Sequence, residues 1–208
     1  VDAGRFDWDR SGRFPTLSER YEGFHKMVFT EEWTSAAFLL RARREGLRDF
    51  GACVSPMNAF QILQGVETLA LRMQKHIDNT RKVVAFLDTH EAVARVIYPE
   101  LPSHPEHALA KTLLPKGCGA VFTFELKGGR EAGRRFIENL RVFSHLANVG
   151  DAKTLIIHPA TTTHYRMDDA ALRAAGITEG TVRLSIGLEN ADDLIEDLSR
   201  GLYASQKA

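Results

Sequence analysis

One arginine near the carboxyl end of the chain has the setting of a ligand-binding side chain. It lies in the stretch TVRLSIGLEN, residues 181–190. Apolar and polar residues alternate there, which predicts a strand with Arg183 on its polar face. A guanidinium on a strand can bind a carboxylate through two parallel hydrogen bonds. The alternative is a solvated surface charge, which is the commoner role of a lone arginine.

A second polar stretch, LANVGDAKTLIIHPATTTHYRM, covers residues 146–167. Asn148, Gly150 and Asp151 predict a turn ahead of a short strand, and three threonines and two histidines follow that strand. Proline fixes the backbone between them. Taken alone, these threonines are typical turn and capping residues.

Two other groups of residues could suggest a ligand site, and both have simpler explanations. His104 and His107 lie in a proline-containing loop without a nearby cysteine or second ligand pair, so solvated loop histidines are favoured over a zinc site. The stretch KGGREAG at residues 127–133 lacks the order of a phosphate-binding loop, and a turn into a helix explains it. We expect no metal site.

Composition narrows the class of protein and of partner. The chain has 208 residues, of which 44% are hydrophobic and 26% charged, with 27 basic and 27 acidic side chains. This balance favours a globular protein whose partners are small molecules or proteins rather than nucleic acid or a membrane. Cys53 and Cys118 lie far apart in sequence, which favours reduced thiols and a cytoplasmic location over a disulfide framework.

The periodicity predicts an α/β fold in which a long helix leads into a small mixed sheet covered by helices. A helix is expected over residues 31–45. Ser55 and Pro56 then start a helix of about 30 residues, bent near Gly65 or Asn79. The remaining elements are strands at 93–99, 120–126, 141–145, 154–159 and 181–187, and helices at 131–140, 168–175 and 191–203.

The amino-terminal region has a different texture. Five aromatic rings lie between residues 6 and 24 among several glycines and a proline, which predicts an irregular segment that packs its rings against another domain or subunit. We interpret residues 1–53 as a segment that links to an upstream domain and residues 54–208 as the main domain. The opening VDAGRFDW has no initiator methionine, and we expect the chain to be part of a longer protein.

These blocks together resemble a known family. The stretches that carry the resemblance are GRFDW, FGACVSPMNAFQILQGVETLALRMQKH, VVAFL, YPEL, HPEH, NVGDAKTLIIHPATTTH and VRLSIGLEN. Their order resembles the Cys/Met-metabolism group of pyridoxal-phosphate enzymes, which have the aminotransferase-like fold type I. NVGDAK resembles the O-acetylhomoserine sulfhydrylase branch in particular.

The resemblance implies specific roles. Arg183 would bind the α-carboxylate of an amino-acid substrate, Asn148 would lie near the same carboxylate, and Thr163 would border the substrate pocket. The expected reaction is γ-replacement of acetate by sulfide or a thiol, giving homocysteine or methionine. Pyridoxal 5'-phosphate would be the cofactor.

The chain departs from the family pattern in one respect, because no lysine has the Schiff-base context. The eight lysines are Lys26, Lys75, Lys82, Lys111, Lys116, Lys127, Lys153 and Lys207. The resemblance therefore implies that this chain is the carboxyl-terminal half, that an upstream half binds the cofactor, and that the chain alone is inactive with no catalytic or cofactor-binding residue of its own. The expected partners are that upstream half and further copies, as a dimer or tetramer.

Two alternatives stay open. Methionine γ-lyase or cystathionine γ-synthase chemistry would use the same Arg183. A non-catalytic assembly module would use the aromatic segment for subunit contacts.

Overall fold

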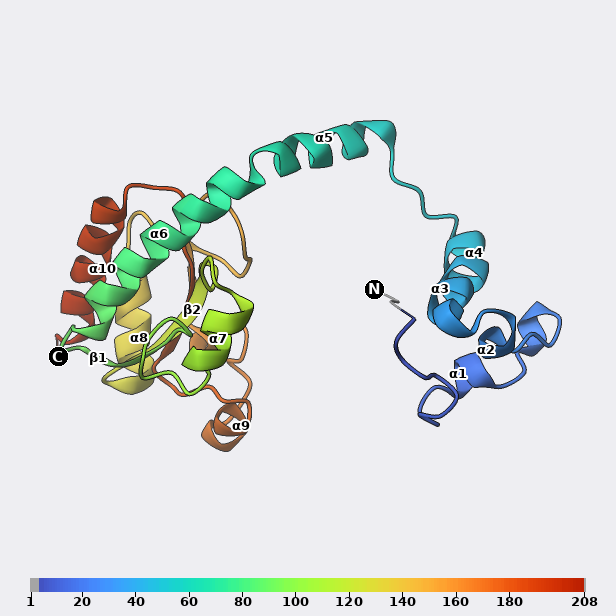
Figure 1. The fold of residues 1–208 in the computed structure, drawn as a ribbon. Helices are drawn as coiled ribbons and strands as arrows, with labels where there is room; N and C mark the ends of the chain where they lie inside the picture. The colour runs from blue at the N-terminus through green and yellow to red at the C-terminus, as the bar shows by residue number, and fades with distance from the viewer. Residues whose placement is uncertain (1–3, 208) are drawn as a thin grey trace. The chain divides into compact units, whose positions relative to one another are not determined.

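The computed structural model describes residues 4–207, which form two compact units, one up to Leu63 and one from Gln64 onward. Each unit is described by itself (Figure 1). Within the described residues, no helix combines the length and the apolar character needed to cross a bilayer. The division at Leu63 lies ten residues beyond the domain boundary expected from sequence, and that boundary stays a proposal.

The amino-terminal unit is built from short helical segments. They are α1 Pro15–Ser18, η1 Glu22–Phe24, α2 Phe29–Glu32, η2 Thr34–Ala36, α3 Ala37–Arg41, the π-helical η3 Ala42–Leu47 and α4 Arg48–Phe50. The single helix predicted over 31–45 is therefore wrong. The backbone leaves the helical region at Trp33, where φ is −151° and ψ is 79°. It passes through the 3-10 turn η2, and the α-helix resumes at Ala37.

A small core holds this unit together. Leu17, Phe29 and Ala37 are buried, and Trp8 and Tyr21 pack against them. The aromatic segment therefore finds part of its packing within its own unit, which the sequence had not predicted. Phe6 and Phe14 remain 49% and 37% exposed, although their rings contact each other with centroids 5.8 Å apart.

The long helix predicted from Pro56 is interrupted once, at Thr68, to give α5 Pro56–Glu67 and α6 Leu69–Asp88. The Ser55 hydroxyl accepts a hydrogen bond from the Asn58 N–H at 3.1 Å, so the predicted start is confirmed. The break lies three residues beyond Gly65, while α6 runs unbroken through Asn79.

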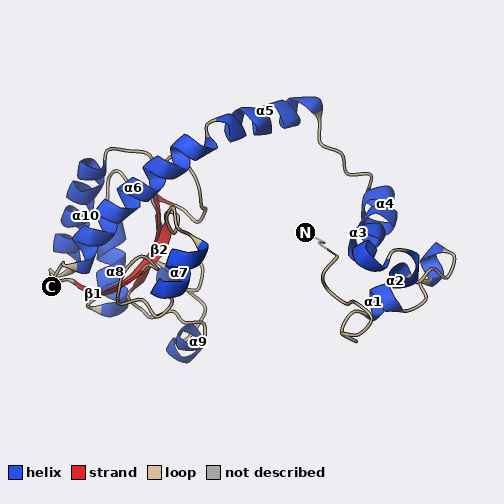
Figure 2. Ribbon diagram, viewed as in Figure 1, coloured by secondary structure: helices blue, strands red, loops and turns tan. Residues whose placement is uncertain are grey.

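The carboxyl-terminal unit contains a five-stranded mixed sheet in the order β1-β2-β5-β4-β3. The strands are β1 Val93–Ile97, β2 Val121–Leu126, β3 Ser144–His145, β4 Leu155–Ile157 and β5 Thr181–Ser185. β5 lies at the centre and pairs antiparallel with β2 and β4, while β3 and β4 are parallel. The predicted small mixed sheet is confirmed (Figure 2).

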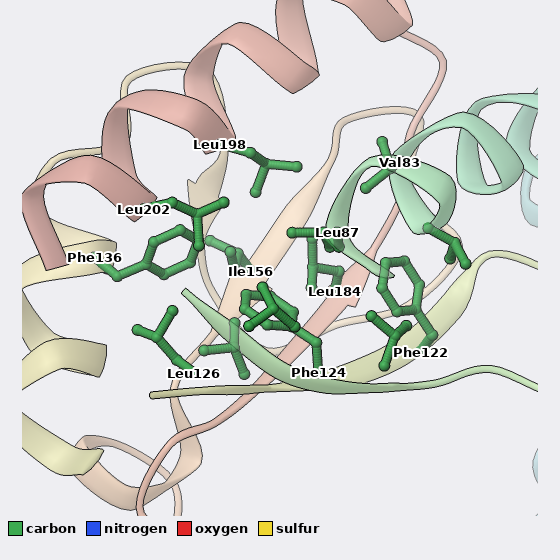
Figure 3. Close-up of a cluster of buried hydrophobic side chains, with 14 of the residues drawn as sticks. Val83, Leu87, Phe122, Phe124, Leu126, Phe136, Ile156, Leu184, Leu198 and Leu202 are labelled. Atoms are coloured by element: carbon green, nitrogen blue, oxygen red, sulfur yellow. The ribbon is translucent and has the colours of Figure 1, made fainter. Parts of the chain in front are cut away.

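Three helices cover one face of this sheet: α6, α8 Gly129–Glu138 and α10 Ala191–Ser205. Phe136 from α8 and Leu198 from α10 pack over Phe124 and Leu184 of the strands (Figure 3). All four side chains are fully buried, and burial of such large apolar groups stabilises the unit by roughly 1.5–3 kcal/mol each.

The remaining elements are short: α7 His107–Leu113, η4 Pro159–Thr161 and α9 Asp169–Ala174. The sequence placed His107 in a loop, whereas it begins α7. The helix predicted over 168–175 is confirmed, with the Asp168 carboxylate accepting from the Ala171 N–H at the amino-terminal cap.

Candidate functional site

Arg183 lies at the middle of the central strand β5, with Thr123 of β2 and Ile157 of β4 as its cross-strand neighbours. Every other residue of β5 is buried, and Arg183 alone is half-buried. Thr181 and Ser185 share its face, because side chains two residues apart on a strand point the same way. The predicted polar face is thus confirmed, and only its arginine remains open to solvent.

Hydrogen bonds explain why the other polar residues of that face are buried. The Thr181 hydroxyl accepts from the Thr178 N–H at 2.8 Å, and the Ser185 hydroxyl accepts from the Gly150 N–H at 3.2 Å. Buried hydroxyls need such partners. The second bond also fixes the turn that contains Asn148 against the end of β5.

Asn148 comes close to Arg183 in space. The Arg183 Nη2 atom donates to the Asn148 backbone carbonyl at 3.4 Å. The Asn148 side-chain oxygen accepts from the Val149 N–H at 2.9 Å, so its Nδ2 group is left as a hydrogen-bond donor. A guanidinium and an amide N–H₂ are both donors, and together they suit a carboxylate.

Thr163 lies farther along, in the turn after η4. Its side chain is exposed, and its hydroxyl is 2.8 Å from the His164 Nδ1 atom. In the described part of the chain no hydrogen bond joins Thr163 to Arg183 or Asn148. The structure therefore brings two of the three predicted substrate contacts together and places the third on a separate turn.

Arg130 of α8 holds the turn that leads to Thr163. Its guanidinium donates to the Ala160 carbonyl and lies 3.7 Å from the Asp169 carboxylate and 3.6 Å from the Glu179 carboxylate. No local pattern indicates this role, because Arg130 follows a glycine pair in a stretch that predicts only a helix start.

His158 is a buried residue whose role is structural. Its Nε2–H donates to the Glu179 carbonyl at 2.7 Å, and its Nδ1 atom lies 2.9 Å from the Thr161 hydroxyl. A side-chain carbon added at Gly133 would overlap the ring. Burial lowers the pKa of His158 below its ordinary value, so the imidazole is neutral near pH 7.

The histidines and cysteines that could suggest a metal site lie apart from one another. Among residues 4–207 no three histidine, cysteine or acidic side chains are arranged to hold a metal ion. The His107 Nδ1 atom lies 3.0 Å from the Pro99 carbonyl, and the His104 Nδ1 atom accepts from the Glu106 N–H. Both cysteines are free thiols.

A cavity of about 270 Å³ lies elsewhere in the same unit, beside Arg81, Glu100 and Cys118. Arg81 Nε and Glu100 Oε2 are 2.7 Å apart, so their charges are already paired. Burial raises the pKa of the Cys118 thiol. This cavity offers no thiolate, and the one further cation in its lining, Lys111, is an exposed side chain on α7, so the Arg183 region is the better candidate.

The lysines do not form a cofactor site. All eight lie within the described residues, and all eight side chains are exposed. Lys127 donates to the Glu91 carbonyl and Lys207 lies over the Tyr203 ring. Lys111 lines the cavity beside Arg81 and Glu100, but no lysine side chain is buried, so the residues of this chain do not enclose a site for pyridoxal phosphate by themselves.

Comparison with known proteins gives the family context of this geometry. Residues 20–203 match the family described as Cys/Met metabolism PLP-dependent enzyme. The chain is 44% identical to a homocysteine synthase of Schizosaccharomyces pombe, over 97% of this chain and 47% of the relative. It is 46% identical to O-acetyl-L-homoserine sulfhydrylase 1 of Thermus thermophilus, over 97% and 48%.

A solved structure agrees. A Campylobacter jejuni chain assigned as an O-acetylhomoserine (thiol)-lyase, which carries a pyridoxyl-lysine monophosphate, is 40% identical with a TM-score of 0.80. The match covers 92% of this chain and 45% of that one. The chain thus spans about half the length of the relatives that it matches.

Proposed function

The chain belongs to the family of Cys/Met metabolism PLP-dependent enzymes, and on that premise we propose that it is the carboxyl-terminal portion of an O-acetylhomoserine sulfhydrylase. The identities of 44% and 46% to a homocysteine synthase and an O-acetyl-L-homoserine sulfhydrylase support this choice. So does the segment NVGDAK at residues 148–153. The proposed reaction is replacement of the γ-acetoxy group of the substrate by sulfide or a thiol.

In this proposal the chain binds the amino-acid end of the substrate. Arg183 holds the α-carboxylate with the two parallel N–H groups of its guanidinium, and the Asn148 Nδ2 group donates to the same carboxylate. Thr163 borders the pocket on the turn after η4. Pyridoxal phosphate, when bound by the upstream half, supplies the electron withdrawal that γ-replacement needs. The chain alone is inactive.

The observation that carries the proposal is the placement of Arg183. It is the one half-buried residue of a strand that is otherwise buried, and within the described residues the only hydrogen bond of its guanidinium is long, at 3.4 Å. An arginine fixed by the centre of a sheet yet weakly engaged is available to a ligand carboxylate.

The test is Arg183→Lys in the full-length enzyme. A lysine keeps the charge but loses the bidentate geometry, so kcat/KM for O-acetylhomoserine should fall by the equivalent of about 2–3 kcal/mol. Arg95→Lys is the matched control, because Arg95 lies on β1 with a 59% exposed side chain paired to Glu125. Equal kinetics in the two variants would contradict the proposal and would indicate that Arg183 is a solvated surface charge.

We also propose that the protein works in the cytoplasm as an oligomer and contacts its upstream half through the amino-terminal unit. Phe6 and Phe14, still partly exposed, support such a contact. Sedimentation of this chain with and without the upstream half tests it. Self-association that the upstream half suppresses is expected, whereas a monodisperse monomer would contradict the contact.

A further inference from the structure

A glutamate beyond the end of β5 joins the two segments that carry Arg183 and Asn148. The Glu189 carboxylate accepts two hydrogen bonds from Thr154, one from its backbone N–H and one from its hydroxyl, both at 2.7 Å. Thr154 is completely buried. In the described residues no lysine or arginine pairs with Glu189, so hydrogen-bond donors alone stabilise its charge.

Backbone hydrogen bonds also join the 148–154 turn to the residues that follow β5. The Thr154 hydroxyl, which donates to Glu189, also accepts from the Gly187 N–H at 2.8 Å. The Leu188 N–H donates to the Ala152 carbonyl at 2.8 Å. A side-chain carbon at Gly187 would overlap the Ala152 carbonyl and the Glu189 carboxylate, so the two segments approach as closely as backbone allows.

Helix α6 also holds the segment after β5 through hydrogen bonds. The Asn79 Nδ2 group donates to the Gly187 carbonyl at 3.0 Å and to the Glu189 carbonyl at 2.8 Å. The His76 Nδ1 atom is 2.6 Å from the Ile186 carbonyl. Both side chains are buried. The backbone that carries Glu189 is therefore rigid, and the glutamate transmits that rigidity to Thr154.

The geometry points to Glu189 as a positioning residue for the carboxylate-binding pair. Through Thr154 it holds the 148–154 turn against the end of β5, and this sets the distance between Asn148 and Arg183. Glu189 does not itself touch the substrate. The inference rests on the proposed function, because the pair matters for catalysis only if it binds the substrate carboxylate.

The principal test is Glu189→Gln in the full-length holoenzyme. The two Thr154 donors use different oxygens of the Glu189 carboxylate. A glutamine replaces one of these oxygens by an N–H₂ donor, so one of the two hydrogen bonds is lost. The turn should loosen, and KM for O-acetylhomoserine should rise on the order of tenfold, with a smaller change in kcat. Glu196→Gln is the matched control, since Glu196 has a 79% exposed side chain on α10. It should leave both constants unchanged.

Substitutions at Thr154 separate positioning from general stability. Thr154→Ser keeps the hydroxyl and should retain the parent KM, whereas Thr154→Val loses it and should reproduce the rise seen in Glu189→Gln. The double variant Arg183→Lys with Glu189→Gln should lower kcat/KM by less than the product of the two single effects, because both residues act on binding of the same substrate carboxylate.

Amide hydrogen exchange in the holoenzyme gives a readout that is independent of turnover. Residues 148–154 should exchange faster in Glu189→Gln than in Glu196→Gln, while α8 stays protected. Faster exchange with an unchanged KM would overturn the positioning role, as would a KM that rises equally in both glutamine variants. If Arg183→Lys itself has no kinetic effect, the proposed function fails, and the exchange data still show whether Glu189 fixes the turn.

Discussion

Arg183 donates to the backbone carbonyl of Asn148 across 3.4 Å, although 35 residues separate the two in sequence. The bond is longer than the usual 2.7–3.2 Å of an N–H···O contact, so it costs little to replace. An incoming carboxylate can therefore take the guanidinium without breaking a strong internal bond, and in the proposed function the Asn148 side-chain N–H₂ group donates to the same ligand.

The first prediction follows from that pairing. Asn148→Asp replaces a donor by a second anion beside the proposed carboxylate site, so KM for O-acetylhomoserine should rise further than in Asn148→Ala, by roughly tenfold. Steady-state kinetics of both variants in the full-length enzyme measure this. Indistinguishable KM values would mean that the Asn148 side chain does not face the substrate.

The second prediction concerns the close approach at Gly187. Gly187→Ala should lower the free energy of unfolding by about 1–3 kcal/mol, because the new methyl group overlaps backbone and carboxylate atoms. Gly65→Ala is the control: Gly65 has open space around it on α5, and alanine there should be neutral or stabilising by up to about 1 kcal/mol. Urea unfolding compares them. An equally stable Gly187 variant would show that the turn can move aside.

The third prediction is a loss of stability in mild acid. Burial holds the pKa of His158 below its ordinary value of 6.5, so the unfolded chain takes up this proton first. The contribution of neutral, buried His158 to the free energy of unfolding is complete above pH 6.5. It is lost as the pH falls from there through the lower pKa of the folded state. Urea midpoints between pH 7.5 and 5.5 should therefore decrease.

A control separates His158 from an exposed histidine. His104→Gln should keep the same decrease, whereas His158→Asn should be less stable throughout and should lose much of the pH dependence. A flat profile for the parent chain would show that His158 can be protonated in place.

The fourth prediction is that this chain alone does not bind pyridoxal phosphate at a single lysine. All its lysines are exposed, so borohydride reduction after incubation with the cofactor should give only low, distributed labelling. Peptide mapping is the measurement. One stoichiometric adduct, with absorbance typical of a bound cofactor, would contradict this.

Much of the carboxyl-terminal unit could be predicted because local and global signals agree there. The alternation around Arg183 predicts β5, and the turn into a helix after the glycine pair at residues 128–129 predicts the start of α8. The approach of Asn148 to Arg183 depends on the pairing of β4 with β5. Hydrophobic periodicity does not predict which strands pair. Only the family resemblance indicated that Asn148 and Arg183 lie near the same carboxylate.

Prediction from the sequence failed where contacts between distant residues determine the local structure. The break at Trp33 lies inside a stretch with helical composition, and packing of Phe29 and Ala37 into a small core overrides the local preference. Asn190 caps α10 through a local contact, since its side chain accepts from the Asp192 N–H. The contact of Glu189 with Thr154 spans 35 residues and leaves no local pattern.

The central position of β5 has a consequence for how the unit is assembled. β5 is the last strand in chain order yet separates β2 from β4, so neither neighbour can pair on that side until residues 181–185 have been synthesised. A nascent or truncated chain that stops before Thr181 would hold two unjoined strand pairs with open edges, which are sites of aggregation. Folding of this unit should therefore be late, and a premature stop even near the carboxyl terminus should yield insoluble protein rather than a shortened domain.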